Sequence, residues 1–136
     1  MKAVIQEETT GCAIASSAAL AGVSYTAAKK VAHSLGITAA DPTLWSSTKY
    51  IRKILHHYQI NIDKTETPFK NWQDLPDLAL LATKWHLEKG KPYWHWVVFV
   101  RNDSQEYVLD SSTTCKEHVR TDFGRIKPKW FIGVKK

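Results

Sequence analysis

The spacing of hydrophobic residues changes along the chain, from a helical period in the first half to strand-like runs in the second. Three helices are predicted, over residues 11–21, 27–34 and 44–57. In the second of them, Ala28, Val31 and Ala32 fall on one face. Gly22 and Gly36 follow the first two helices, which is typical of residues that end a helix in a left-handed conformation.

Strand patterns separated by turn residues make up the second half of the chain. The predicted strands are residues 59–63, 78–86, 94–101, 106–110 and 130–134. Turns are expected over 89–92 and 102–105, and an irregular stretch over 64–77 with one short helix around Trp72. Helices that precede antiparallel strands predict an α+β fold, in which N-terminal helices pack on a C-terminal antiparallel β-sheet.

The length and composition predict one globular domain over residues 1–136. The chain is 43% hydrophobic and 24% charged, which is ordinary for a globular protein and excludes wholesale disorder. It has no apolar run of about 18 residues, so no membrane span is expected. Because no secretory signal is recognisable, we expect a soluble cytoplasmic protein in which Cys12 and Cys115 are free thiols.

The positive charge is concentrated near the C-terminus. Residues 116–136 contribute +5 of the formal net charge of +6. Such a segment can attract an acidic partner or nucleic acid. We interpret it as a solvated face and do not expect nucleic-acid binding, because no recognised nucleic-acid-binding motif accompanies the charge.

Cys12 is the first candidate for chemistry. It lies where the first helix begins, after Gly11, which would let the chain turn sharply there. Unpaired backbone N–H groups and the positive end of the helix dipole stabilise a thiolate at such a position. The alternative is a buried cysteine that acts as a small apolar residue among the neighbouring alanines.

His95 and Asp110 are candidates for the groups that activate a thiol. His95 begins the apolar strand run, Asp110 ends the next strand, and a hairpin joins the two, so their register can bring carboxylate and imidazole together. An orienting carboxylate fixes the histidine tautomer and supports its charged form, which keeps the thiol ionised. Gln6, six residues before Cys12, can donate to an oxyanion together with the Cys12 backbone N–H.

These motifs resemble those of a known enzyme family. Gln6-x5-Cys12 before a helix, then His95-Trp96-Val97-Val98 and Tyr107-Val108-Leu109-Asp110, is similar to the papain-like fold. Within it, the chain most resembles the bacteriocin-processing, double-glycine-leader cysteine peptidases and their stand-alone relatives. The separations of 83 residues from Cys12 to His95 and 15 from His95 to Asp110 fit that family. The resemblance implies that Cys12 is the nucleophile, His95 the general base and acid, Asp110 the orienting acid and Gln6 the oxyanion donor.

Two departures from the family pattern bear on specificity. The family usually has Asp-Cys-Gly at the nucleophile and Asp-Pro at the acid, whereas this chain has Gly11-Cys12-Ala13 and Asp110-Ser111. The four functional side chains are unchanged, but specificity for a double-glycine leader does not follow. The transporter that often accompanies such peptidases is also not recognisable, so processing coupled to export is not expected.

The resulting expectation is a thiol hydrolase with a Cys-His-Asp catalytic triad. It would cleave an amide or peptide bond of a peptide or protein substrate through an acyl-enzyme on Cys12, with no cofactor and no metal. Protein deamidation or acyl transfer would use the same residues with a different acceptor. The other alternative is a papain-like module that binds a partner without catalysis. The sequence makes no prediction of oligomeric state.

Two further patterns invite other interpretations. Cys115-x2-His118 has the spacing of half a metal site, which Cys12 and His95 could complete, but we interpret Cys115 as a thiol in a surface loop. Trp94 and Trp96 flank His95, and strand alternation places both on the face opposite its imidazole. One of them is expected to form a wall of the substrate groove.

Overall fold

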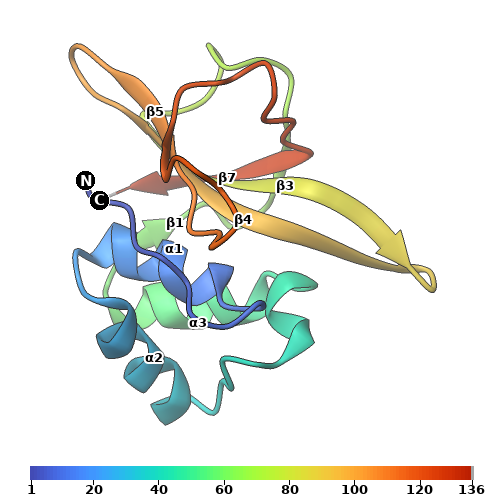
Figure 1. Cartoon of the computed structure of the whole chain (residues 1–136). Helices are drawn as coiled ribbons and strands as arrows, with labels where there is room; N and C mark the ends of the chain where they lie inside the picture. The colour runs from blue at the N-terminus through green and yellow to red at the C-terminus, as the bar shows by residue number, and fades with distance from the viewer. Residues whose placement is uncertain (136) are drawn as a thin grey trace.

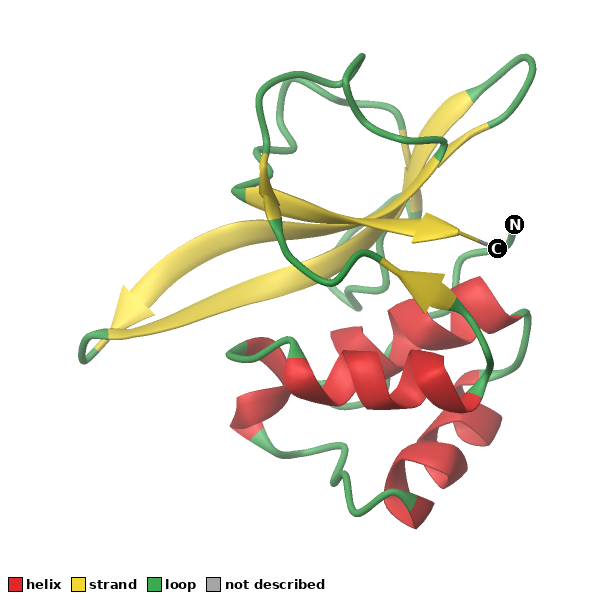
Figure 2. Ribbon diagram, turned by 180° about the vertical axis from the view of Figure 1, so that it is seen from behind, coloured by secondary structure: helices red, strands yellow, loops and turns green. Residues whose placement is uncertain are grey.

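Helices form one layer and an antiparallel sheet forms the other in residues 1–135, the part of the chain that the computed structural model describes (Figure 1, Figure 2). The helical elements are α1 Cys12–Ala21, α2 Tyr25–Ser34, the 3-10 helix η1 Pro42–Trp45 and α3 Lys49–His57. The strands are β1 Asn61–Ile62, β2 Thr67–Pro68, β3 Leu78–Glu88, β4 Lys91–Arg101, β5 Glu106–Leu109, β6 Val119–Arg120 and β7 Trp130–Lys135. The prediction of an α+β fold is therefore confirmed.

The sheet is built around the long hairpin of β3 and β4. Its strand order over the described residues is β1-β7-β3-β4-β5-β6, with β2 also paired to β7, and all pairs are antiparallel. β7 pairs with β3 from Ala79 to Ala82, and β5 pairs with β4 from Val98 to Arg101. The distal part of the hairpin therefore extends beyond both neighbours, as Figure 1 shows. A bulge interrupts the β3–β4 register between Thr83 and His86.

The helices α1 and α2 agree with the sequence pattern. Gly22 follows α1 with a left-handed backbone (φ 72°), as predicted. Ser24 caps α2 by accepting a hydrogen bond from the Ala27 N–H. None of the described helices has the length and apolarity needed to cross a bilayer.

The single helix predicted over 44–57 is wrong, because the structure divides it into η1 and α3. The Asp41 side chain accepts a hydrogen bond from the Thr43 N–H and starts η1 with Pro42 at its first position. The Ser47 hydroxyl then accepts from the Lys49 N–H, and α3 begins at Lys49. Hydroxyl side chains that bind nearby backbone compete with a continuous helix, which explains the interruption over residues 46–48.

Other differences occur where the pattern is short. The strand predicted over 59–63 is reduced to β1, and the two-residue strands β2 and β6 were not predicted. Residues around Trp72 form turns instead of a helix, because Asn71 accepts from the Asp74 N–H and donates to the Asp74 carboxylate. β4 begins at Lys91, three residues earlier than predicted, after a turn at Lys89 and Gly90.

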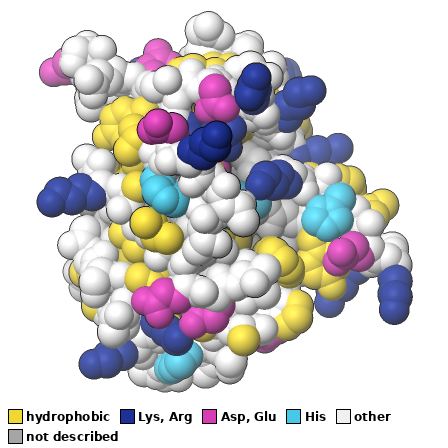
Figure 3. All heavy atoms as spheres, in the orientation of Figure 1, with side chains coloured by type: hydrophobic (Ala, Val, Ile, Leu, Met, Phe, Trp, Pro, Cys, Tyr) yellow, Lys and Arg dark blue, Asp and Glu magenta, His cyan; other side chains and the backbone are white. Residues whose placement is uncertain are grey.

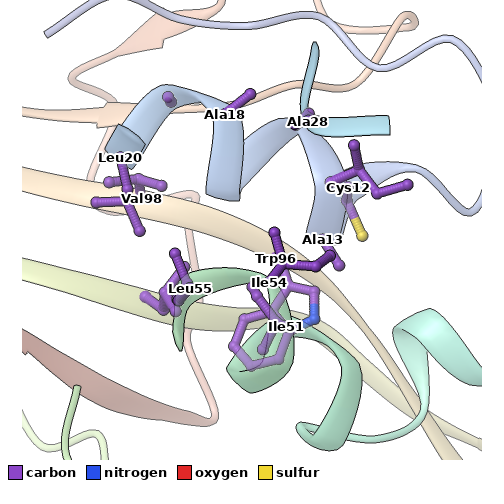
Figure 4. Close-up of a cluster of buried hydrophobic side chains, with 14 of the residues drawn as sticks. Cys12, Ala13, Ala18, Leu20, Ala28, Ile51, Ile54, Leu55, Trp96 and Val98 are labelled. Atoms are coloured by element: carbon purple, nitrogen blue, oxygen red, sulfur yellow. The ribbon is translucent and has the colours of Figure 1, made fainter. Parts of the chain in front are cut away.

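Two apolar cores lie on opposite faces of the sheet, and alternation along β4 divides the side chains between them. Trp96 and Val98 belong to the core shared with α1, α2 and α3 (Figure 4). Val97 and Phe99 belong to the second core, which irregular segments cover on the other face. Cys12 belongs to the same cluster of buried side chains as Trp96 (Figure 4).

Candidate active site

The segment before α1 is fixed by contacts with α2. The Tyr25 hydroxyl donates to the Glu8 carboxylate, and Lys29 forms an ion pair with the same carboxylate at 2.6 Å. Gly11 lies against Tyr25 so closely that a Cβ at this position would overlap the Tyr25 hydroxyl oxygen. Its φ of −81° is open to any residue, so Gly11 provides space for Tyr25 and not the sharp turn that the sequence suggested.

Cys12 is the first residue of α1, where its backbone N–H has no partner within the helix. Its side chain is fully buried, with 0% exposure, and packs with the alanine-rich start of the helix. The thiol is free of disulfide bonding. A helix start places the positive end of the helix dipole near this sulfur.

The β4–β5 register brings His95 and Asp110 together. Val98 pairs with Leu109, so the next residue, Asp110, lies opposite Val97. Val97 and His95 are two residues apart on β4 and therefore share one face of the strand. His95 Nε2 lies 2.8 Å from Asp110 Oδ1, and both side chains are buried, with residue exposures of 9% and 1%. The hairpin that joins the two strands thus places the carboxylate beside the imidazole, as the sequence predicted.

The Cys12 side chain lies close enough to the His95 ring to raise its pKa. Since Nε2 is bound to Asp110, Nδ1 is the ring nitrogen that remains for the thiol. The three predicted residues are therefore arranged in the order sulfur, imidazole, carboxylate. This order matches the geometry in which an imidazole takes a proton from a nucleophile while an acid orients the ring.

The electrostatics of this cluster favour charged His95 and charged Asp110. Burial alone would lower the pKa of His95, but hydrogen bonds with Asp110 and Cys12 outweigh it and raise the pKa to about 9. Burial alone would raise the pKa of Asp110. The hydrogen bonds from His95, the Ser112 N–H and Arg120 prevail and hold it well below its ordinary value of 3.8.

Gln6 lies next to the cluster, but its amide is engaged elsewhere. Its Nε2 donates to the carbonyl oxygens of Glu8, at 3.0 Å, and Thr9, at 2.9 Å. Its Oε1 accepts from the Ser111 hydroxyl at 2.8 Å. Both amide hydrogens are thus used within the protein, and donation to an oxyanion requires one of them to be released. The oxyanion role of Gln6 stays a prediction.

Arg120 is a member of the cluster that the sequence reasoning missed. Its Nη1 donates to Asp110 Oδ2 at 2.9 Å, while Nε and Nη2 donate to Asp122 at 2.9 and 2.7 Å. The guanidinium therefore holds the carboxylate oxygen that His95 does not use. Arg120 lies on β6, which is two residues long, so no periodicity in the sequence marks its direction.

A cleft of about 300 Å³ opens onto His95. Its lining residues come from the segment before α1, η1, the β3–β4 hairpin and the loop after Asp110, and they include Gln6, Trp45, Lys84, Trp94 and His95. Trp96 is fully buried instead, so of the two flanking tryptophans Trp94 forms a wall. Cys12 lies behind this lining, and contact between its sulfur and a substrate requires the cleft wall to move.

A larger hollow of about 630 Å³ lies away from this cluster, between α3 and β1. It is lined by residues such as Arg52, His56 and Ile60 and includes neither His95 nor Gln6. The described part of its lining includes His56 and His57 but no cysteine, serine or threonine that could act as the nucleophile. The smaller cleft is therefore the candidate active site.

Cys115 and His118 form a separate pair on the loop between β5 and β6. His118 Nδ1 lies 3.4 Å from the Cys115 sulfur and donates to the Asp110 carbonyl oxygen at 2.9 Å. Burial and the charge of Asp110 raise the pKa of Cys115. Within residues 1–135, no group of three or more His, Cys, Asp or Glu side chains is arranged to hold a metal ion, so this pair does not join Cys12 and His95 in one site.

Comparison of the chain with protein-family models, curated proteins and solved structures found no match.

Proposed function

We propose that the protein is a thiol hydrolase of the papain-like kind, with Cys12 as its nucleophile. The observation that carries the proposal is the chain of contacts from Cys12 to His95 to Asp110, with a 2.8 Å bond between the last two. The helix-borne sulfur and the strand-borne imidazole also agree with a papain-like arrangement, in which helices pack on an antiparallel sheet.

The proposed reaction begins with proton transfer from the Cys12 thiol to His95 Nδ1. The thiolate sulfur then forms a bond to the carbonyl carbon of an amide, and the C–N bond breaks as the imidazolium gives its proton to the leaving amine. Water attacks the resulting thioester while His95 takes its proton. The C–S bond breaks, and the carboxylic acid leaves with Cys12 regenerated.

Asp110 and the Cys12 backbone have supporting roles in this scheme. Asp110 holds the imidazole through Nε2 and stabilises its charged form. The Cys12 backbone N–H is directed to the oxyanion that forms at the carbonyl, as a donor at a helix start can be. Gln6 would add a second donor once one of its bonds to Glu8 or Thr9 opens.

A pair of cysteine variants tests the proposal. We expect a thiol-directed activity probe to label the wild type and Cys115→Ser, and to leave Cys12→Ser unlabelled. A peptide-library digestion should give cleavage with wild type and Cys115→Ser, and none with Cys12→Ser. Equal labelling of Cys12→Ser and wild type, with no cleavage of any peptide, would contradict the assignment.

A further inference from the structure

The catalytic cleft continues into two basic hollows through Lys84. Lys84 lines the cleft of about 300 Å³ and also both neighbouring hollows, of about 470 and 590 Å³. Thr114 is shared by the cleft and one hollow, and Arg125 by the two hollows. Together the two hollows form what we call the basic groove, lined by Lys84, Lys116, Arg120, Arg125, Lys127 and Lys129. The groove therefore begins at the wall of the cleft that holds His95.

The described lining of the basic groove has six basic residues against two acidic ones, Glu117 and Asp122, so its net charge is positive. Lys84, Arg125 and Lys127 are exposed, and among the described residues none of them forms a salt bridge. Arg120 differs, since its guanidinium is bound to Asp110 and Asp122. Figure 3 shows Lys and Arg side chains gathered on the face where the segment after β5 lies in Figure 1. This surface can accept negative charge from outside the chain.

The backbone fixes where the charge of Lys84 lies. Lys84 has a left-handed backbone conformation (φ 53°) within the bulge that interrupts β3. A bulge redirects a side chain out of the regular strand alternation, here to the point where the cleft and both hollows meet. A non-glycine residue in this conformation is uncommon and is found more often where function fixes the backbone.

We propose that the basic groove binds an acidic segment of the peptide substrate, next to the bond that Cys12 cleaves. This inference rests on the proposed function. A chain that leaves the cleft past Lys84 enters the groove directly, so its carboxylates come within reach of Lys84, Arg125 and Lys127. The basic C-terminal region is then part of substrate recognition.

An acidic peptide fits this groove better than a nucleic acid does. Single-stranded nucleic acid is usually bound on open aromatic faces that stack on its bases. In the described part of the groove the aromatic side chain is Trp85, and Lys129 lies over its ring at 4.8 Å from the centroid. The groove also leads to a cleft equipped for acyl chemistry, which a peptide carbonyl can use.

Binding to Cys12→Ala tests the proposal without catalysis. The probes are three fluorescein-labelled peptides, of alternating Gly with Glu, Gln or Lys, and a labelled oligodeoxythymidine, measured by fluorescence anisotropy. We expect the Glu peptide to bind at least about 10-fold more tightly than the Gln peptide, and to lose affinity as salt rises from about 20 to about 200 mM. Equal binding of the Glu and Gln peptides, or affinity independent of salt, overturns the proposal.

Two charge-matched double variants locate the binding site. In the Cys12→Ala background, Lys84→Glu with Lys127→Glu should weaken binding of the Glu peptide at least about 10-fold. Lys30→Glu with Lys64→Glu makes the same change of net charge at exposed lysines outside the groove, and should weaken it less than about threefold. The proposal is overturned if both double variants lose the same affinity for the Glu peptide. It is also overturned if the oligodeoxythymidine binds more tightly than the Glu peptide and this binding is lost in the groove variant. If the glutamate double does not fold by circular dichroism, Lys84→Gln with Lys127→Gln replaces it under the same criterion.

These results are separable from those of the proposed function. Alkylation of Cys12 in the wild type reports the nucleophile and does not depend on the groove. A reactive Cys12 with no preference for the Glu peptide removes the groove proposal alone. An inert Cys12 with groove-dependent binding removes the hydrolase and leaves the groove as a binding site for acidic peptides.

Discussion

Two pairs of a cysteine and a histidine lie near Asp110, and they differ in the atoms of Asp110 that they contact. His95, which lies beside Cys12, contacts its carboxylate, whereas Cys115 and His118 contact its backbone carbonyl. A carbonyl oxygen accepts hydrogen bonds only, so His118 Nδ1 carries the hydrogen that it donates there. The nitrogen nearest Cys115 is thus unable to take the thiol proton. His95 faces its thiol with the nitrogen that Asp110 does not use.

The comparison predicts that the reactivity of a thiol depends on which atoms face it, and not on residue type or proximity alone. The sulfur of Cys115 lies 3.4 Å from an imidazole and still donates to the Ser112 carbonyl oxygen at 3.1 Å. The charge of Asp110 acts in opposite directions on the two pairs. It supports an imidazolium at His95 and raises the pKa of Cys115, which disfavours a thiolate there.

The largest expected effect is from Asp110→Asn, which keeps the shape of the side chain and removes its charge. We expect kcat/KM to fall about 10³-fold, because the carboxylate no longer orients His95 or stabilises its charged form. Steady-state cleavage of a substrate found in the peptide library measures this. Asp122→Asn, which alters the other carboxylate bound to Arg120, is the matched control and should lose less than about 10-fold. Similar losses in both variants would contradict the role of Asp110.

The next largest effect is a difference in alkylation rate between Cys12 and Cys115. At about pH 6 we expect iodoacetamide to alkylate Cys12 at least about 10-fold faster than Cys115, because burial and the charge of Asp110 raise the pKa of Cys115 and disfavour its thiolate. The pKa of His95, raised to about 9, keeps an imidazolium beside Cys12 at that pH. Peptide mass spectrometry of the alkylated protein gives both rates in one sample. His95→Ala should remove the difference, and equal rates in the wild type would refute the comparison.

Stability should depend on pH through His95. Its pKa is about 9 in the folded protein and about 6.5 in an unfolded chain, so the folded state binds the proton more tightly. The resulting stabilisation, of the order of 3 kcal/mol, is complete below about pH 6.5 and is lost as the pH rises through about 9. The stabilisation by His95 also requires the charged Asp110 carboxylate. Because the pKa of Asp110 is lowered, this carboxylate becomes protonated only at strongly acidic pH.

Urea unfolding of wild type and His95→Gln measures this dependence. The difference in free energy of unfolding between the two proteins should shrink between about pH 6 and about pH 10. A difference that is constant or grows over this range would contradict a raised pKa for His95.

A smaller effect is expected from Arg120, which acts through Asp110. Arg120→Gln should lower kcat about 10-fold and change KM little, because the guanidinium holds Asp110 and its charge in the basic groove is already paired with Asp110 and Asp122. Arg120→Lys should recover part of kcat. Arg125→Gln, in the basic groove, should instead raise KM with kcat nearly unchanged. A loss confined to KM in Arg120→Gln would argue against a positioning role.

The smallest effect is expected from the second pair. His118→Ala should leave kcat/KM within about twofold of the wild type, because its ring contacts the Asp110 backbone and not the carboxylate. The same cleavage assay measures it. A loss as large as that of Asp110→Asn would mean that the two pairs work as one unit.

The sequence predicted the parts of the site that local pattern controls. Cys12 at a helix start and the hairpin between His95 and Asp110 follow from short-range signals, and a hairpin's register brings such residues together. The contact between Arg120 and Asp110 could not be predicted, because the direction of the Arg120 side chain depends on a two-residue strand that pairs with β5. The hydrogen bonds of Gln6 were also unpredictable, since they depend on the path of the backbone at Glu8 and Thr9.

The same reasoning applies to the fold. A run of alanines and other small residues predicted α1, helical periodicity predicted α2, and the long apolar runs predicted β3 and β4. The interruption between η1 and α3 depends on individual side chains, Asp41 and Ser47, whose hydrogen bonds with backbone outweigh helix periodicity. Short strands such as β1 and β2 exist because β7 pairs with them, which sequence spacing does not reveal.

The residues of the site come from both layers of the fold, so the site is complete only when the two layers are packed together. The sulfur comes from the helical layer, the imidazole from β4 and the carboxylate from the residue after β5, and residues 64–77, irregular apart from β2, lie between these two parts of the chain. If the chain were cut in that stretch, each piece would hold an incomplete site. Thiol reactivity at Cys12 would then return only when the pieces associate, which makes alkylation a readout of fragment complementation.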